Sequence, residues 1–181
     1  MTESVASAYL VTGEEPVRYG NAHASVVPYQ VLPTADSEII LAVGNDRQFK
    51  LLCEGVLERP DLAADERFAT NRSRLKHRDA LIPQLEETLR TRTAAEWQSR
   101  LASTGIPTGA VRTVGQALGS PEAAARQMVT SVAHPTAGRL ELVSSPIRMS
   151  GTPIREPSAP PLLGQHTDEV LAELGIHGPG R

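Results

Sequence analysis

Two apolar, β-branched runs near the N-terminal end constrain the fold of this chain more than any other feature. The runs Val26–Leu32 and Ile39–Val43 flank the turn-forming sequence PTADS at 33–37. Apolar runs on either side of such a turn predict a β-hairpin. The second run is followed by Gly44-Asn45-Asp46, whose polar side chains can cap a helix.

Three helices are predicted after the hairpin. In Asp46–Val56 the apolar residues fall at helical spacing, which indicates an amphipathic helix. A longer helix is expected from about Asp79 to Arg92, with Pro83 in its first turn, where a missing N–H does little harm. The sequence Thr93-Ala94-Ala95-Glu96 is a capping box that starts a third helix. The expected buried residues are Phe49, Leu52, Cys53, Val56, Ile82, Leu85, Leu89, Trp97 and Leu101.

A basic cluster lies between the first two of these helices, in Asp65–Arg78. One interpretation is a phosphate site, or a surface for RNA. The interpretation we favour is a solvated connection with a charged helix start. The net charge of −3 also argues against a nucleic-acid partner.

The second half of the chain changes in character. A short strand at Ala110–Val114 precedes two short helices, and the runs Met128–Ala133 and Arg139–Val143 predict a second hairpin. From Ser145 onward, repeated prolines exclude a long helix or central strand and indicate an extended connector. Thr167 is expected to cap a final helix.

Composition excludes several classes of protein. Hydrophobic residues make up 40% of the 181, which is ordinary for a globular domain. The single cysteine, Cys53, excludes an internal disulfide and suits a reducing compartment. No apolar run approaches the length of a membrane span, and the N-terminus lacks the features of a secretory signal. We therefore expect a cytoplasmic protein with no membrane partner.

The residues alone do not reveal a catalytic site. No phosphate-binding glycine motif is present, and no cysteine or histidine spacing suggests a metal site. Ser25 and His23 are too close in sequence to be taken as a catalytic pair. An α/β fold with a short, mainly antiparallel sheet is the only firm conclusion at this level.

The stretch 19–49 resembles the class III CoA-transferases, also called the CaiB/BaiF type, which include formyl-CoA transferase and α-methylacyl-CoA racemase. The matching residues are GN-H at 20–23, PYQ at 28–30, TAD at 34–36 and AVGNDRQF at 42–49. They look most similar to the transferases that act on dicarboxylates such as succinate. The resemblance runs from about Tyr9 to Gly175 and corresponds to the C-terminal portion of the family protein.

The resemblance implies a reaction and an organisation. In the family, an aspartate of the large N-terminal domain attacks an acyl-CoA thioester, so the nucleophile is expected upstream and absent from this chain. Coenzyme A is a substrate, and no further cofactor or metal is implied. The expected divisions are 1–23, the end of the large domain with a glycine-containing loop; 24–144, a small α/β domain; and 145–181, a proline-rich return segment with a C-terminal helix. The expected partners are acyl-CoA and carboxylate substrates, and the large domain or a second copy of the chain.

The same resemblance implies which residues lie near the substrate. The family's mobile loop falls on Gly20, Asn21, Ala22 and His23, and Tyr29 and Gln30 follow on the next strand. Two alternatives to a CoA-transferase stay open. The first is a non-catalytic binding or assembly module, and the second is part of an acyl-CoA racemase. The position near which a racemase has an acidic residue is Pro33 in this chain, which argues against the racemase.

Overall fold

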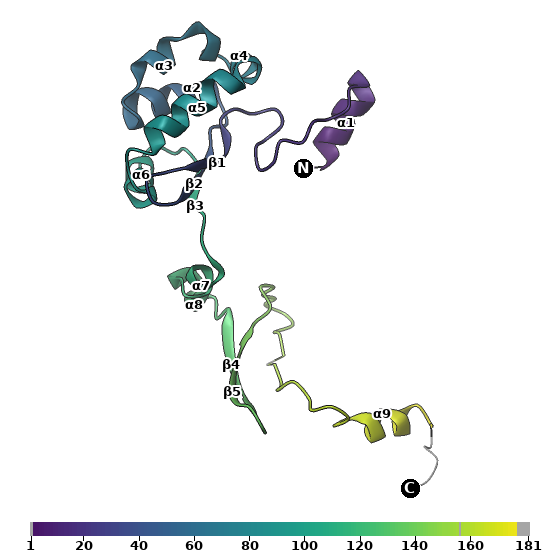
Figure 1. Cartoon of the computed structure of the whole chain (residues 1–181). Coiled ribbons are helices and arrows are strands. Elements are labelled where there is room, and N and C mark those ends of the chain that lie inside the picture. Colours follow the sequence, from purple (N-terminus) through teal and green to yellow (C-terminus); the bar gives the residue numbers. More distant parts are fainter. Residues whose placement is uncertain (1, 156, 177–181) are drawn as a thin grey trace. The chain divides into compact units, whose positions relative to one another are not determined.

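The structure is a computed structural model that describes residues 2–155 and 157–176. It consists of two compact units, residues 1–111 and 112–181 (Figure 1). The division between the units falls inside the predicted 24–144 domain. The predicted boundaries after residues 23 and 144 therefore stay predictions.

The first unit contains a three-stranded antiparallel sheet. Strands β1 (Tyr29–Pro33) and β2 (Glu38–Ala42) form the predicted hairpin, with Leu32 opposite Ile39. Strand β3 (Thr108–Ala110) lies on the other side of β2, so the order is β1-β2-β3. The third strand was predicted at 110–114. It lies earlier because the backbone already pairs at Pro107, whose carbonyl accepts the Ala42 N–H at 3.0 Å.

Helices follow and flank this sheet. The predicted Asp46–Val56 helix is present, but its second half is wound as a π-helix. Helix α5 (Arg78–Leu89) packs beside β1 (Figure 1). Asn45 caps the first turn by accepting the Gln48 N–H, as predicted. The helical segments are α1 (Thr2–Thr12), α2 (Asp46–Leu51), the π-helix η1 (Leu52–Val56), α3 (Pro60–Ala64), the 3₁₀ helix η2 (Glu66–Phe68), α4 (Asn71–Lys76), α5 (Arg78–Leu89) and α6 (Ala94–Leu101).

The hydrophobic core of the first unit lies between the hairpin and these helices. The predicted stripes are buried, apart from the partly buried Ile82. Trp97 is buried and donates its indole N–H to the Leu89 carbonyl at 2.7 Å. The capping box at Thr93 and Glu96 has both of its expected hydrogen bonds. The core members are Val27, Leu32, Ile39, Leu41, Val43, Phe49, Leu52, Cys53, Val56, Leu57, Leu62, Phe68, Leu81, Leu85, Leu89, Trp97, Leu101 and Ile106.

The position of Pro83 differs from the prediction. Helix α5 begins at Arg78, which places Pro83 in its second turn rather than its first. A proline there leaves the carbonyl of Asp79 without its helical N–H donor. Pro83 is exposed on the surface of the unit, so water can bind that carbonyl.

The basic cluster is only partly the solvated connection that we favoured. Arg74 is fully buried, and its guanidinium donates to the Val27 carbonyl at 2.7 Å, the Phe68 carbonyl at 2.9 Å and the Asp46 carboxylate at 2.8 Å. It also lies over the Phe49 ring, 4.4 Å from its centroid. A buried charge is tolerated when its donors are all directed at acceptors. Charge counting along the sequence cannot detect such an arrangement.

The second unit contains the second predicted hairpin, formed by β4 (Val129–His134) and β5 (Gly138–Val143). His134 accepts the backbone N–H groups of Thr136 and Ala137 at Nδ1, so it has a structural role in the turn of this hairpin. The helices are α7 (Val114–Leu118), α8 (Pro121–Ala125) and α9 (Thr167–Glu173). Between β5 and α9 the described chain contains no helix or strand, as predicted for the connector, but it turns at residues 163–166 before α9 begins.

The final helix begins one position earlier than predicted. His166 is the cap residue of α9, and Thr167 is its first helical residue. Within the second unit, Leu163 and Leu174 of this segment are exposed and Leu171 is half-buried. The predicted separation of the C-terminal segment from the core around Trp97 stays a prediction.

We predict that replacing Arg74 destabilises the first unit more than replacing any exposed arginine does. Arg74→Met leaves the buried carbonyls of Val27 and Phe68 without this donor and removes the cation paired with Asp46. We expect a loss of about 3 kcal/mol in the free energy of unfolding. Urea unfolding followed by Trp97 fluorescence measures this loss. The control Arg72→Met, at an exposed position on the same helix, should change stability by less than about 0.5 kcal/mol. Equal effects of the two substitutions would contradict the structural role of Arg74.

A second prediction concerns acid. The Ala94 N–H donates to Asp36 at 2.8 Å and, with Thr34, lowers the pKa of this carboxyl below 3.8. The ionised form is therefore favoured in the folded state. Its contribution is present above pH 3.8 and is lost as pH falls through the lowered pKa. Asp36→Asn should be less stable than the native chain at pH 7, and the difference should shrink below pH 3.8. A difference that is constant from pH 7 to pH 2 would contradict this role.

Candidate functional site

The loop predicted to lie near the substrate runs along the free edge of β1. The Asn21 side-chain carbonyl accepts the Val31 N–H at 3.0 Å, and the His23 N–H donates to the Tyr29 carbonyl at 2.8 Å. Backbone groups at alternate positions of an edge strand point away from the sheet and need partners. The loop supplies these partners, so Asn21 and His23 fix it against the strand.

The turn at the start of this loop depends on glycine. Gly20 has φ +61°, in the left-handed region where side chains are strained, and the Ala22 N–H donates to the Tyr19 carbonyl at 3.0 Å. A β-carbon on Gly20 would meet no atom within 4 Å. The requirement for glycine here is therefore one of backbone conformation and not of space.

His23 and Tyr29 lie together. Their rings are stacked with centroids 5.2 Å apart and planes 20° from parallel. The Ser25 backbone N–H donates to His23 Nδ1 at 3.1 Å, which assigns the ring proton to Nε2. Nδ1 is thus occupied by a turn contact, and the pair Ser25–His23 has the structural role that its sequence spacing indicated.

A pocket opens beside the loop. It has a volume of about 410 Å³ and is formed by three parts of the first unit: the residues before and within the loop, Gln30 on β1, and the first two turns of α5. Its lining residues are Arg18, Tyr19, Ala22, Gln30, Arg78, Asp79, Ile82 and Pro83. Of the six predicted site residues, Ala22 and Gln30 line this pocket, whereas Gly20, Asn21, His23 and Tyr29 are not among its lining residues. The role of all six towards a substrate stays a prediction.

Side chains of α4 and α5 hold the loop and the segment after it by their backbones. Arg78 donates to the His23 carbonyl at 2.7 Å and lies over the Tyr19 ring at 5.2 Å. Asn71 donates to the Ser25 carbonyl at 2.8 Å and accepts the Val27 N–H at 3.0 Å. Arg74 binds the Val27 carbonyl, as described above. We call Asn71, Arg74 and Arg78 the α4–α5 clamp.

Sequence reasoning missed this clamp. Its members are spaced three and four residues apart, which places them on one side of successive helical turns. The spacing of these polar residues in the basic cluster was the signal that could have revealed the clamp. We preferred the interpretation as a solvated connection because a run of charged residues is more often exposed to solvent.

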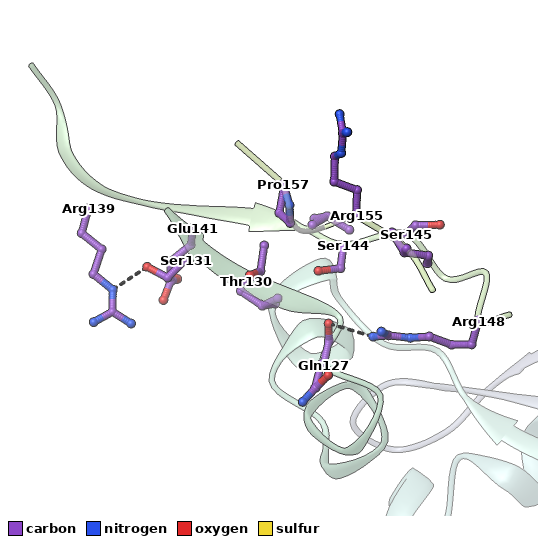
Figure 2. Close-up of a pocket in the computed structure, with 13 residues that line it drawn as sticks. Gln127, Thr130, Ser131, Arg139, Glu141, Ser144, Ser145, Arg148, Arg155 and Pro157 are labelled. Carbon is purple, nitrogen blue, oxygen red and sulfur yellow. Dashed lines mark hydrogen bonds between the residues drawn. The ribbon is translucent and has the colours of Figure 1, made fainter. Parts of the chain in front are cut away.

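A larger cavity, of about 750 Å³, lies in the second unit, between the β4–β5 hairpin and the following connector (Figure 2). Three arginines line it, but they do not converge. Arg139 donates to Ser131 Oγ at 2.5 Å, Arg148 donates to the carbonyls of Arg126 and Gln127, and Arg155 points away from the other two (Figure 2). Because these charges diverge, the cavity does not form a focused anion site.

Other chemistry is not supported in the part of the chain that the structure describes. Within it, no cluster of histidine, cysteine or acidic residues could hold a metal ion. Burial raises the pKa of the Cys53 thiol to about 12, so this cysteine is a poor nucleophile, as predicted. None of the described helices is both long enough and apolar enough to span a membrane.

The contact of Asn21 with β1 can be tested by hydrogen exchange. In Asn21→Ala the Val31 amide loses its acceptor, and we expect its exchange to become about fivefold faster, the equivalent of about 1 kcal/mol. The Leu32 amide, which faces β2, is the internal control and should keep its rate. Unchanged exchange at Val31 would show that Asn21 does not hold the loop.

The chain is similar to known proteins over nearly its whole length. It is 37% identical over 171 residues to the succinate–glutarate CoA-transferase of Agrobacterium fabrum, covering 92% of this chain and 41% of that protein. It is 32% identical over 170 residues to human succinyl-CoA:glutarate CoA-transferase, covering 94% of this chain and 39% of the relative. The chain thus spans about two fifths of the length of these relatives.

A solved structure and a family model agree with these similarities. The crystal structure of a CaiB/BaiF family protein from Brucella suis matches with a TM-score of 0.78 and 37% identity, over 94% of this chain and 44% of that one. The model of CoA-transferase family III matches residues 1–167. The mixed α/β fold with small antiparallel sheets, predicted from the sequence, is confirmed. From its sequence and its fold, the chain belongs to CoA-transferase family III.

Proposed function

We propose that this chain is the C-terminal part of an enzyme that transfers CoA between an acyl-CoA and a carboxylic acid, with a dicarboxylyl-CoA such as succinyl-CoA as donor. The observation that carries the proposal is the Gly20–His23 loop, fixed against β1 beside an open pocket within the region that matches the family. The names of the relatives, which act on succinyl-CoA with glutarate, support the substrate class.

The proposed chemistry is covalent catalysis. An aspartate carboxylate attacks the thioester carbonyl, the C–S bond breaks, and CoA leaves as a thiolate while an acyl–aspartyl anhydride forms. The CoA thiolate then attacks the aspartyl carbonyl of the anhydride, which releases the donor acid as a carboxylate and leaves an aspartyl-CoA thioester. The acceptor carboxylate attacks this thioester, which releases the CoA thiolate and forms a second anhydride. Attack of the thiolate on the acceptor carbonyl of this anhydride gives the new acyl-CoA and frees the aspartate carboxylate. We assign this aspartate to the portion of the family protein that the chain does not span.

The proposed role of the loop is to cover the reacting group. An acyl anhydride is readily hydrolysed, so an enzyme that forms one has to exclude water from it. Gly20 and Ala22 are small enough for a close approach, while Asn21 and His23 tie the loop to the sheet. A loop that is anchored at two points and thin between them can close over a ligand without dismantling the strand beside it.

The racemase alternative is weaker. It requires acid and base residues for exchange of an α-proton, and the matching position is Pro33, the last residue of β1. The alternative of a non-catalytic assembly module makes a different prediction for a mixture of the chain with the large domain. The module would bind the large domain without CoA transfer, whereas the enzyme proposal predicts both binding and transfer.

The proposed partner is the large domain of the family, or a second copy of the chain. Exposed apolar residues on α1 and in the C-terminal segment support this proposal, among them Leu10, Val11, Leu163 and Leu174. Binding to a partner would cover such side chains on each of the two segments. We therefore expect the chain to associate at high concentration in sedimentation experiments.

The direct test is reconstitution. The purified chain is mixed with the N-terminal portion of a related dicarboxylate CoA-transferase, and formation of glutaryl-CoA from succinyl-CoA and glutarate is measured. We expect transfer by the mixture and none by the chain alone. Transfer by the chain alone, or no transfer by a complex that forms, would contradict the proposal.

A variant of the loop sharpens this test. His23→Ala removes the stack on Tyr29 and the turn contact to Ser25, so the loop should be misplaced over the substrate. We expect kcat in the mixture to fall about 100-fold. The matched control is His134→Ala, which removes the same kind of imidazole turn contact from the second hairpin. If both variants lose activity equally, the effect is not specific to the loop.

A further inference from the structure

We propose that the pocket beside the Gly20–His23 loop binds the non-reacting carboxylate of a short dicarboxylic acid, through the guanidinium groups of Arg18 and Arg78. This inference rests on the proposed function and names the part of the substrate that the site selects. It follows from the charge, the lining and the fixed donors of the pocket.

The first observation is an excess of positive charge without partners. Arg18, Arg78 and Asp79 all line the pocket, so two cations face one carboxylate. None of the salt bridges in the described residues includes any of the three. In contrast, arginines of the first unit such as Arg59 and Arg67 form salt bridges with nearby carboxylates. Two arginines left unpaired in one pocket are suited to an anionic ligand.

The second observation is that Arg78 is held in place before any ligand binds. Its Nη2 donates to the His23 carbonyl, and its guanidinium lies on the Tyr19 ring. These contacts fix the plane of the group while leaving further N–H donors for a ligand. A fixed guanidinium loses less conformational entropy on binding and presents its donors in a geometry that fits a carboxylate. Arg18 is exposed, so it can move to close over the same anion.

The third observation concerns the remaining walls. Ile82, Pro83, Ala22 and the Tyr19 ring give the pocket apolar surface, and Gln30 adds an amide. This lining suits a short methylene chain that ends in a carboxylate better than it suits a compact, fully polar anion such as phosphate. The loop forms one wall, so a ligand held here extends towards the group that the loop would cover.

The consequence is a rule for specificity. A dicarboxylate places one carboxylate on the arginines and the other under the loop, whereas a monocarboxylate of similar length leaves the arginines without an anion. A ligand that lacks the group recognised by charged donors loses much affinity, because the donors are left without a partner. The loss is larger than the one caused by a missing methylene in an apolar site.

The test is an NMR titration of the full 181-residue chain with glutarate, its neutral diamide glutaramide, and inorganic phosphate. We expect glutarate to shift the amides of Ala22, Gln30 and Asp79 saturably, with a Kd at least about tenfold lower than that of glutaramide or phosphate. The difference from glutaramide should narrow as salt is added, because the exposed charges are screened. Equal affinity for glutarate and glutaramide, or for glutarate and phosphate, would overturn the inference.

Variants separate binding from folding. Arg18 is exposed and makes no hydrogen bond in the described residues, so Arg18→Gln should leave the fold intact and raise the Kd for glutarate about tenfold. Arg78→Lys keeps the charge but loses the planar fork, and should also weaken glutarate binding while glutaramide binding is unaffected. The control Arg72→Gln removes an equally exposed arginine outside the pocket and should change neither Kd. An Arg18→Gln chain that binds glutarate as tightly as the native chain would overturn the inference.

The reconstituted mixture distinguishes this inference from the proposed function. In it, Arg18→Gln should raise KM for glutarate about tenfold and leave kcat unchanged. Transfer with an unchanged KM for glutarate would overturn the pocket assignment and leave the proposed function intact. A complex without transfer, formed by a chain that still binds glutarate selectively, would contradict the proposed function and support the site.

Discussion

The buried guanidinium of Arg74 is the interaction on which the first unit depends. It joins three segments that are distant in the sequence, through Val27 before β1, Phe68 in η2 and Asp46 at the start of α2. Asp46 is half exposed, so the charge of Arg74 is compensated at the boundary of the core and not inside it. Removing the cation would leave acceptors in the interior without donors, whereas removing Asp46 leaves the two carbonyls bound.

The same arrangement places the candidate site. Asp46 also accepts the Asn71 N–H at 2.8 Å, so the start of α2 and the start of α4 are held together. From there the α4–α5 clamp reaches the backbone at His23, Ser25 and Val27 in turn. The clamp binds backbone atoms from the helix side, while Asn21 and His23 hold the loop to β1 from the sheet side. The geometry of the loop is therefore set by both the helices and the sheet.

The local elements could be predicted because their signals are local. The turn at 33–37, the capping box of Thr93 and Glu96, and the helical stripe around Leu85 each depend on residues that are adjacent or one turn apart. The six candidate site residues were found through resemblance to a family, since no motif of nucleophile and base was present. The burial of Arg74, the clamp and the unpaired arginines of the pocket depend on contacts between residues 25 to 60 positions apart, which periodicity cannot report.

Our central proposal is that the clamped Gly20–His23 loop covers the reacting group when the chain is combined with the large domain of the family. Hydrogen–deuterium exchange of the chain mixed with the large domain tests it most directly, with and without succinyl-CoA. The account predicts that adding the acyl-CoA slows exchange in peptides that contain residues 18–24, while exchange in the β4–β5 hairpin is unchanged. Unaltered exchange at 18–24 in a complex that binds succinyl-CoA would contradict it.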